Sequence, residues 1–287
     1  METLAKKLRQ GSLLQLLLLH CLYSQKGSGE IVFQGGTSLR WIYGGQRASE
    51  DLDFVSPLPK KQLRKILDQS FRQVHPLCLS QFGPGSFEER PLRSSEGSLR
   101  TYAIFRPKAQ RERIAVRIEI EELRANYSPG HRRVVLMDLP SVFKEMREGI
   151  LIIPYSSSIL SVETPEEILT DKLRALFERP YLKGRDLFDL WFLHTLFNTQ
   201  INLSDLDQKL KSYVRPFRPA RKASFFLKKE NDELFRQTLQ TDLRPFLPSL
   251  VYEEMERSGF AKILSALEEI LQPLVKEGLD EMIASHG

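Results

Sequence analysis

Apolar residues recur along the chain with two different periods, and the change between them divides the sequence into two parts. Leucines at helical spacing fill residues 4–25, and a second helical pattern occupies residues 58–74. In residues 114–121 every second position is apolar instead, as in a strand with one buried face. We therefore predict an α+β fold, with a small mixed sheet flanked by helices in residues 1–163 and an α-helical domain in residues 164–287.

Short runs of apolar and β-branched residues predict the other strands of the sheet. Gly44 and Gly45 end a short helix predicted over residues 37–43, and the glycine-, proline- and serine-rich residues 83–98 predict a loop. Thr164 is an N-cap followed by proline, which begins the helical half. The predicted strands are residues 30–33, 51–55, 101–105, 114–121, 150–153 and 159–162.

Composition narrows the class of protein without deciding its function. The 287 residues are 41% hydrophobic and 28% charged, which excludes a collagen-like or low-complexity chain and suffices for one large domain or two modest ones. The longest apolar run, residues 13–22, falls short of the roughly 20 residues that span a bilayer, so we expect no membrane segment. Cys21 and Cys78 form no spaced motif and predict a reducing compartment, the cytoplasm.

A pair of glycines follows the first predicted strand and precedes a helix. Gly35 and Gly36 leave room for a phosphate to approach the backbone, and N–H groups at the start of a helix favour anions. Thr37 and Ser38 add hydroxyl donors at the same place. A glycine pair after a strand is also common as a simple tight turn. On this pattern we predict a phosphate-binding turn.

Two aspartates on one face of the next strand supply the second half of a catalytic pattern. Asp51 and Asp53 alternate along the predicted strand, so both carboxylates point the same way and can share Mg²⁺ or Mn²⁺. Either feature alone is ordinary, since such aspartates are often just surface carboxylates. Together, a glycine turn for phosphate and a carboxylate pair for metal are the minimum for phosphoryl or nucleotidyl transfer.

Residues 34–40 and 47–54, in this order, resemble the AbiEii/AbiGii-type nucleotidyltransferase toxins. These are the toxins of type IV toxin–antitoxin and abortive-infection systems, and they belong to the DNA polymerase β-like nucleotidyltransferase superfamily. The resemblance continues through residues 166–190, and Gln34 stands where the family commonly has lysine. It implies a nucleotidyltransferase domain in residues 1–163, followed by a helical domain that completes the NTP site.

The superfamily implies a third carboxylate on a neighbouring strand. Residues 114–121 form the best candidate, and Glu119 lies between two isoleucines, as expected of a ligand embedded in a sheet. Glu121 points the same way but lies at the end of the strand. We favour Glu119 as the third metal ligand, with Asp51 and Asp53, and keep Glu121 as the alternative. Arg117 on the same face leaves open a solvated polar surface.

The helical half supplies cations for a triphosphate. Lys172 and Arg179 are seven residues apart, so on one helix they would share a face and could grip phosphates. A solvated face that pairs with neighbouring acids is the alternative. On the mostly apolar next helix, Asp186 and Asp189 must find cations, because unpaired buried charge is costly.

The partners of these aspartates decide between a structural ion-pair network and a site. Arg185 can reach Asp189 along the helix, and Lys172 or Arg179 can approach from the preceding one. The family resemblance favours a catalytic role for Lys172 and Asp186. We assign Arg179, Arg185 and Asp189 to nucleotide binding.

The resemblance implies an enzyme that transfers NMP from an NTP to an acceptor, most simply the 3′ end of a tRNA. Residues 209–229 are rich in lysine and arginine and could follow an RNA backbone. The net charge of the whole chain, +5, also suits an anionic partner. Four aromatic residues there could stack on bases. A cognate antitoxin acting without a stable complex is also implied. The alternatives are a protein or small-molecule acceptor and a non-catalytic NTP-binding module. The aromatic residues are Tyr213, Phe217, Phe225 and Phe226.

Overall fold

The computed structural model describes residues 2–93, 96–154 and 158–286. It divides into two compact units, Met1–Glu163 and Thr164–Gly287. The first unit contains the sheet and the second is helical, so the predicted α+β class is confirmed. Among the described residues, no helix combines the length and the apolar character needed to cross a bilayer.

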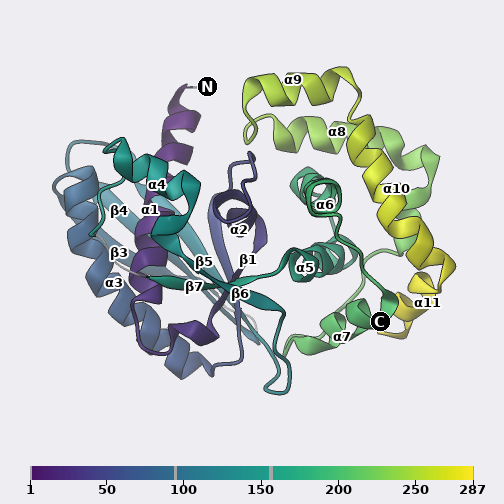
Figure 1. The fold of residues 1–287 in the computed structure, drawn as a ribbon, viewed down its shortest axis with the longest axis horizontal. Helices are drawn as coiled ribbons and strands as arrows, with labels where there is room; N and C mark the ends of the chain where they lie inside the picture. Colours follow the sequence, from purple (N-terminus) through teal and green to yellow (C-terminus); the bar gives the residue numbers. More distant parts are fainter. Residues whose placement is uncertain (1, 94–95, 155–157, 287) are drawn as a thin grey trace. The chain divides into compact units, whose positions relative to one another are not determined.

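The first unit is built on a mixed seven-stranded sheet in the described part of the chain (Figure 1). Its strand order is β3-β4-β5-β2-β1-β7-β6. The pairs β2–β5 and β1–β7 are parallel, and the other neighbours are antiparallel. The strands are β1 (Val32–Gln34), β2 (Asp51–Ser56), β3 (Gly85–Pro91), β4 (Ser98–Pro107), β5 (Ile114–Glu122), β6 (His131–Val135) and β7 (Ile159–Glu163).

Two long helices cover the apolar face of this sheet. They pack against each other and against β3, β4 and β5, because both present rows of buried leucine and isoleucine. On β5 the isoleucines and Val116 are buried, and the polar residues between them are partly exposed on the opposite face. The helices are α1 (Glu2–Tyr23) and α3 (Lys60–Phe82), with two shorter ones, α2 (Gly35–Trp41) and α4 (Pro140–Arg147).

The second unit is centred on a buried pair of helices. Thr164 caps the first of them as predicted, with its hydroxyl accepting the N–H of Glu167 at 3.5 Å. The second, α6, packs against α5, α8 and α10 with apolar side chains on most of its circumference. The helices are α5 (Pro165–Glu178), α6 (Gly184–Phe197), α7 (Leu203–Ser212), α8 (Asp232–Leu243), α9 (Ser249–Arg257), α10 (Ala261–Lys276) and α11 (Leu279–Ser285).

Three predictions about the sheet are corrected. The segment predicted as a loop over residues 83–98 contains strand β3, and β6 was not predicted; both are edge strands whose mostly polar residues carry little of the apolar signal. Residues 150–153 do not form a strand. The side chain of Gln81 instead satisfies the Ile150 carbonyl at 2.8 Å and the Ile152 N–H at 2.7 Å, as a neighbouring strand would.

Candidate active site

The glycine turn touches one of the two aspartates. Pairing of β1 with β2 places Gln34 opposite Asp53, and Gly35 comes directly after it. Gly35 has φ +77°, and a Cβ built there would lie 2.8 Å from Oδ2 of Asp53. Glycine is required twice over, for its left-handed backbone and for the space the carboxylate takes. The two predicted halves of the site therefore meet at one point.

The second glycine makes room for an arginine that sequence analysis did not assign to the site. A Cβ on Gly36 would lie 2.4 Å from Nη2 of Arg47 and 3.2 Å from Oγ of Ser49. Arg47 is buried, and its Nη1 donates to the carbonyl of Ala48 at 2.9 Å. Arg47 could have been assigned to the site from the sequence, because it begins the segment 47–54 that carries the family resemblance. Arg47 supports the turn from the side of the loop that leads to β2.

Thr37 and Ser38 fasten the turn to the sheet. Both are fully buried in α2. The hydroxyl of Thr37 donates to the carbonyl of Asp51, and that of Ser38 donates to the carbonyl of Gly35 at 2.8 Å. In this structure the two hydroxyls fix the positions of Gly35 and Asp51, and their binding to phosphate stays a prediction.

The register of β5 against β2 arranges the carboxylates. Asp51 lies opposite Arg117, and Asp53 lies opposite Glu119. Opposed residues of paired strands project from the same face, so Glu119 is next to Asp53 on the face that carries Asp51. Glu121 lies two residues further along, opposite Val55. This placement supports Glu119 over Glu121 as the third carboxylate.

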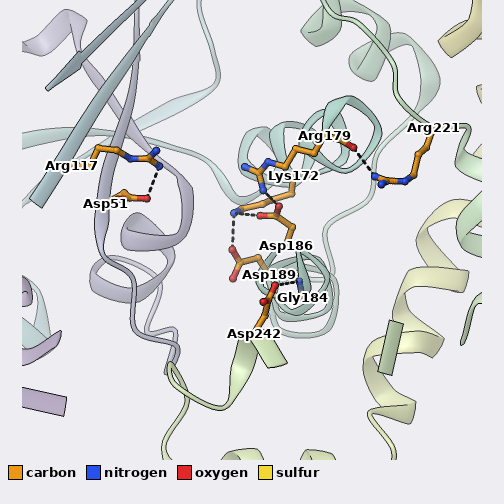
Figure 2. A network of polar contacts seen from close by, with 9 residues as sticks. All are labelled: Asp51, Arg117, Lys172, Arg179, Gly184, Asp186, Asp189, Arg221 and Asp242. Atoms are coloured by element: carbon orange, nitrogen blue, oxygen red, sulfur yellow. Dashed lines mark hydrogen bonds and ion pairs between the residues drawn. The ribbon is translucent and has the colours of Figure 1, made fainter. Parts of the chain in front are cut away.

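Arginines pair with Asp51 and with Glu119. Nη2 of Arg117 lies 2.7 Å from Oδ2 of Asp51 (Figure 2), and Nη2 of Arg100 lies 2.5 Å from Oε1 of Glu119. Within the described residues, no three His, Cys, Asp or Glu side chains are gathered so as to hold a metal as they stand.

The donor set nevertheless suits a hard divalent cation. Carboxylate oxygens are the ligands that Mg²⁺ and Mn²⁺ prefer, and three carboxylates share one face of the sheet. Because Gly35 has no Cβ, the Asp53 carboxylate can lie directly beside the turn. These carboxylates suit such an ion if it takes the place of the arginines that now contact Asp51 and Glu119. Metal binding by Asp51, Asp53 and Glu119 stays a prediction.

The helical unit contains a second charged cluster, in which two buried aspartates hold the predicted cations. Nζ of Lys172 lies 3.1 Å from Oδ1 of Asp186 and 2.7 Å from Oδ2 of Asp189, and Arg179 pairs with Oδ2 of Asp186 (Figure 2). Both aspartates are only 2% exposed. Helix α5 ends at Glu178, so Arg179 reaches Asp186 from beyond the helix and not from a shared helical face as predicted. The guanidinium of Arg185 stacks on Phe246 at 4.3 Å.

A third cation, Lys183, belongs to this cluster and was missed in the sequence. Burial, the largest cause, and the positive charges of Arg179, Arg185 and Lys172 together lower its pKa to about 8, against the opposing effect of Asp186. For Asp186, burial alone would raise the pKa, but Lys172, Arg179 and Lys183 together hold the pKa well below its usual range. The cluster therefore contains more basic than acidic side chains around its two aspartates.

The segment between α5 and α6 is held in place from two sides. Nη1 of Arg221 donates to the carbonyl of Arg179 at 2.6 Å (Figure 2). Nη2 donates to the carbonyl of Pro180 at 2.7 Å. The N–H of Gly184 donates to Oδ2 of Asp242 at 2.8 Å. These contacts fix the backbone that carries Arg179 and Lys183. Arg221 is thus committed within the protein.

The basic segment, residues 209–229, is less open to RNA than its sequence indicates. Lys209 is 1% exposed and lies 2.6 Å from Glu167. Phe225 packs edge-on against Phe226. Arg218 and Lys222 are exposed. The prediction that the aromatic residues stack on bases is wrong for three of the four, because their side chains are buried: Tyr213, Phe217 and Phe226.

Comparison with known proteins agrees with this architecture. Residues 17–273 match the family described as the nucleotidyl transferase AbiEii toxin of type IV toxin–antitoxin systems, which confirms the resemblance drawn from the sequence. No curated protein gives a significant match.

Two solved structures from Helicobacter pylori share the fold. One, described as a candidate nucleotidyltransferase, is 19% identical with a TM-score of 0.53 and covers 94% of this chain and 97% of its own. The other, JHP933, is 18% identical with a TM-score of 0.54 and covers 95% and 94%. At these identities the likeness shows the fold alone.

Replacing Gly35 tests its contact with Asp53. Gly44 is the matched control, because its φ is +75° but nothing lies within 4 Å of a Cβ built there. Alanine at either position costs about 1–2 kcal/mol of unfolding free energy for the left-handed backbone. Gly35→Ala also displaces the carboxylate, for about 1–3 kcal/mol more. Urea denaturation measures both variants, and equal losses would contradict the contact.

Titration of Lys183 tests its burial within the helical cluster. Its pKa of about 8 lies below the ordinary value of 10.5, so the unfolded chain binds the extra proton between these values. Lys183 therefore makes stability rise with pH across that window. Lysine-selective NMR should show a midpoint near pH 8 that Lys183→Arg removes and Asp186→Asn shifts lower. A midpoint above 10 would show that the cluster does not act on Lys183.

Proposed function

The chain belongs to the AbiEii family of nucleotidyl transferase toxins, and from this premise we propose that it is a metal-dependent enzyme that transfers NMP from an NTP to RNA. The observation that carries the proposal is the contact of Gly35 with the Asp53 carboxylate, beside Glu119 on the neighbouring strand. A phosphate-accepting turn and an acidic face meet there.

Asp51, Asp53 and Glu119 would hold Mg²⁺ or Mn²⁺. When bound, the ion supplies charge neutralisation on the phosphates and lowers the pKa of the acceptor hydroxyl. Gly35 and Gly36 admit the β- and γ-phosphates to the backbone at the turn. Thr37 and Ser38 keep that backbone in place through their own hydrogen bonds and add donors where they can turn to a phosphate.

The transfer exchanges one phosphoester bond for another. The acceptor hydroxyl oxygen bonds to the α-phosphorus while the bond from that phosphorus to the bridging oxygen of the β-phosphate breaks, and pyrophosphate leaves. Glu119 orients the hydroxyl and takes its proton. This role is supported by the position of Glu119, which lies next to Asp53 and is partly exposed on the polar face of the sheet.

The cationic cluster of the helical unit would stabilise charge on the leaving pyrophosphate. Lys172 offers a point charge, and Arg179 a guanidinium fork. Asp186 and Asp189 orient the two cations, because both carboxylates contact Lys172 and Asp186 also contacts Arg179. Arg185 adds a positive charge at the start of α6. Such prearranged charge lowers the barrier without reorganisation during the reaction.

RNA is the proposed acceptor, specifically the 3′ end of a tRNA. The net charge of +5 and the exposed Arg218 and Lys222 support a polyanionic partner. Family membership supports a cognate antitoxin, which we propose acts without a stable complex. The free, buried Cys21 and Cys78 suit a reducing compartment, the cytoplasm.

Substituting the two candidate glutamates separately tests the third carboxylate. Glu119→Gln should lower kcat by about 100-fold or more, because it removes both a metal ligand and a proton acceptor. Glu121→Gln should stay within about twofold, because Glu121 lies opposite Val55 of β2 and not opposite Asp53. The assay follows transfer of label from each NTP to total RNA with Mg²⁺. The reverse order would move the role to Glu121.

The same assay tests the proposed function as a whole. Asp51→Ala should abolish transfer of the label while leaving the fold intact by circular dichroism. If the wild-type protein and Asp51→Ala transfer label equally poorly with every NTP tested, the chain is not the proposed enzyme.

Salt dependence tests the RNA acceptor. Binding of tRNA should weaken steeply with salt, and neutralising Arg218 and Lys222 should reduce the slope of log K against log salt by about 1–2. The control removes Lys228 and Lys229, which are ion-paired with Glu230 at 3.6 Å and Glu268 at 2.9 Å, and should change the slope less. Binding that does not respond to salt would exclude RNA contact at this surface.

A further inference from the structure

The acidic face of the sheet contains its own positive charges. Guanidinium groups pair with two of its carboxylates: Asp51 pairs with Arg117, and Glu119 pairs with Arg100. These two guanidinium groups offset part of the negative charge that the carboxylates give this face. An acidic site whose negative charge is partly offset by arginines attracts a free divalent cation more weakly than the carboxylates alone would.

Arg117 is only partly satisfied by its carboxylate. Nη2 contacts Asp51, but the Nε atom is buried without a hydrogen-bond acceptor among the described residues. An unmet buried donor is unfavourable by about 1–3 kcal/mol. The side chain as a whole is still 35% exposed, so Arg117 is not sealed inside the protein. An anion that presents two oxygens would satisfy the group better than Asp51 does.

We propose that Arg117 is a nucleotide-binding residue, which neutralises Asp51 in the free protein and contacts a phosphate of the NTP in the complex. This inference rests on the proposed function, because it assigns a further ligand to the same site. As Asp51 becomes a metal ligand, it releases Arg117, whose fork of N–H donors matches phosphate oxygens. Metal and nucleotide then bind cooperatively, because the metal replaces Arg117 as the partner of Asp51 and the phosphate replaces Asp51 as the partner of Arg117.

Arg100 does not share this role. Its Nε and Nη2 both contact one oxygen of Glu119, at 2.6 and 2.5 Å, so that carboxylate is fixed by two donors. Arg100 therefore orients Glu119 across the β4–β5 pair, whereas Arg117 holds Asp51 through one nitrogen. The difference singles out Arg117 as the arginine that can exchange partners.

The proposal predicts effects of opposite sign for one substitution. Arg117→Gln raises the negative charge of the face, so Mn²⁺ alone should bind about fivefold more tightly. The same substitution removes a phosphate ligand, so α,β-methylene NTPs with Mn²⁺ should bind about tenfold more weakly. Calorimetry measures Mn²⁺ alone and then each of the four analogues. A merely structural ion pair would not move the two affinities apart.

Two further variants make the test specific. Arg106→Gln removes an exposed arginine on β4 that pairs with Glu88 at 2.8 Å, and it should change neither affinity. Arg117→Lys keeps the charge but not the fork, so it should restore the affinity for Mn²⁺ and only part of that for the analogues. Thermal unfolding of each variant confirms that it folds.

The outcomes separate the inference from the proposed function. If wild-type protein binds the analogues with Mn²⁺ but Arg117→Gln shifts both affinities the same way or neither, Arg117 is not a nucleotide ligand. If wild-type protein binds none of the four analogues, the proposed function fails, and the inference fails with it.

Discussion

The site depends on the close approach of the Gly35 backbone to the Asp53 carboxylate. The antiparallel pairing of β1 and β2 brings Gln34 opposite Asp53, so the turn that follows has no room for a side chain. The left-handed backbone of Gly35 and its missing Cβ are both used at this one position. Thr37 ties the same turn to the backbone of Asp51, so the glycines and the aspartates are held as one rigid arrangement.

Both units keep their functional carboxylates neutralised by cations. In the sheet, Arg117 forms an ion pair with Asp51. In the helical unit, Lys172 and Arg179 form ion pairs with Asp186. Buried or half-buried carboxylates without such partners would be strongly unfavourable, so the fold needs these ion pairs before any ligand arrives. In the proposed mechanism, ligand binding exchanges one set of ionic contacts for another, and cations that stabilise the free protein become ligands for phosphate.

Much of this could be predicted from local sequence, and the remainder depends on pairing between distant segments. The alternation in residues 114–121 correctly placed Glu119 on the polar face, because the two-residue period is local. The register that sets Glu119 beside Asp53 and Arg117 beside Asp51 joins residues more than sixty positions apart and has no local signal. Burial likewise makes three of the four aromatic residues of 209–229 part of the core and lowers the pKa of Lys183, and only the packed helices reveal this.

The central claim is that the glycine turn and the carboxylates form one metal–nucleotide site. Anomalous diffraction from a crystal grown with Mn²⁺ and an α,β-methylene NTP tests it most directly. The account predicts a manganese peak bonded to Asp51 and Asp53, with phosphate oxygens against the backbone of Gly35 and Gly36. A manganese peak remote from both aspartates, with the phosphates bound elsewhere, would contradict it.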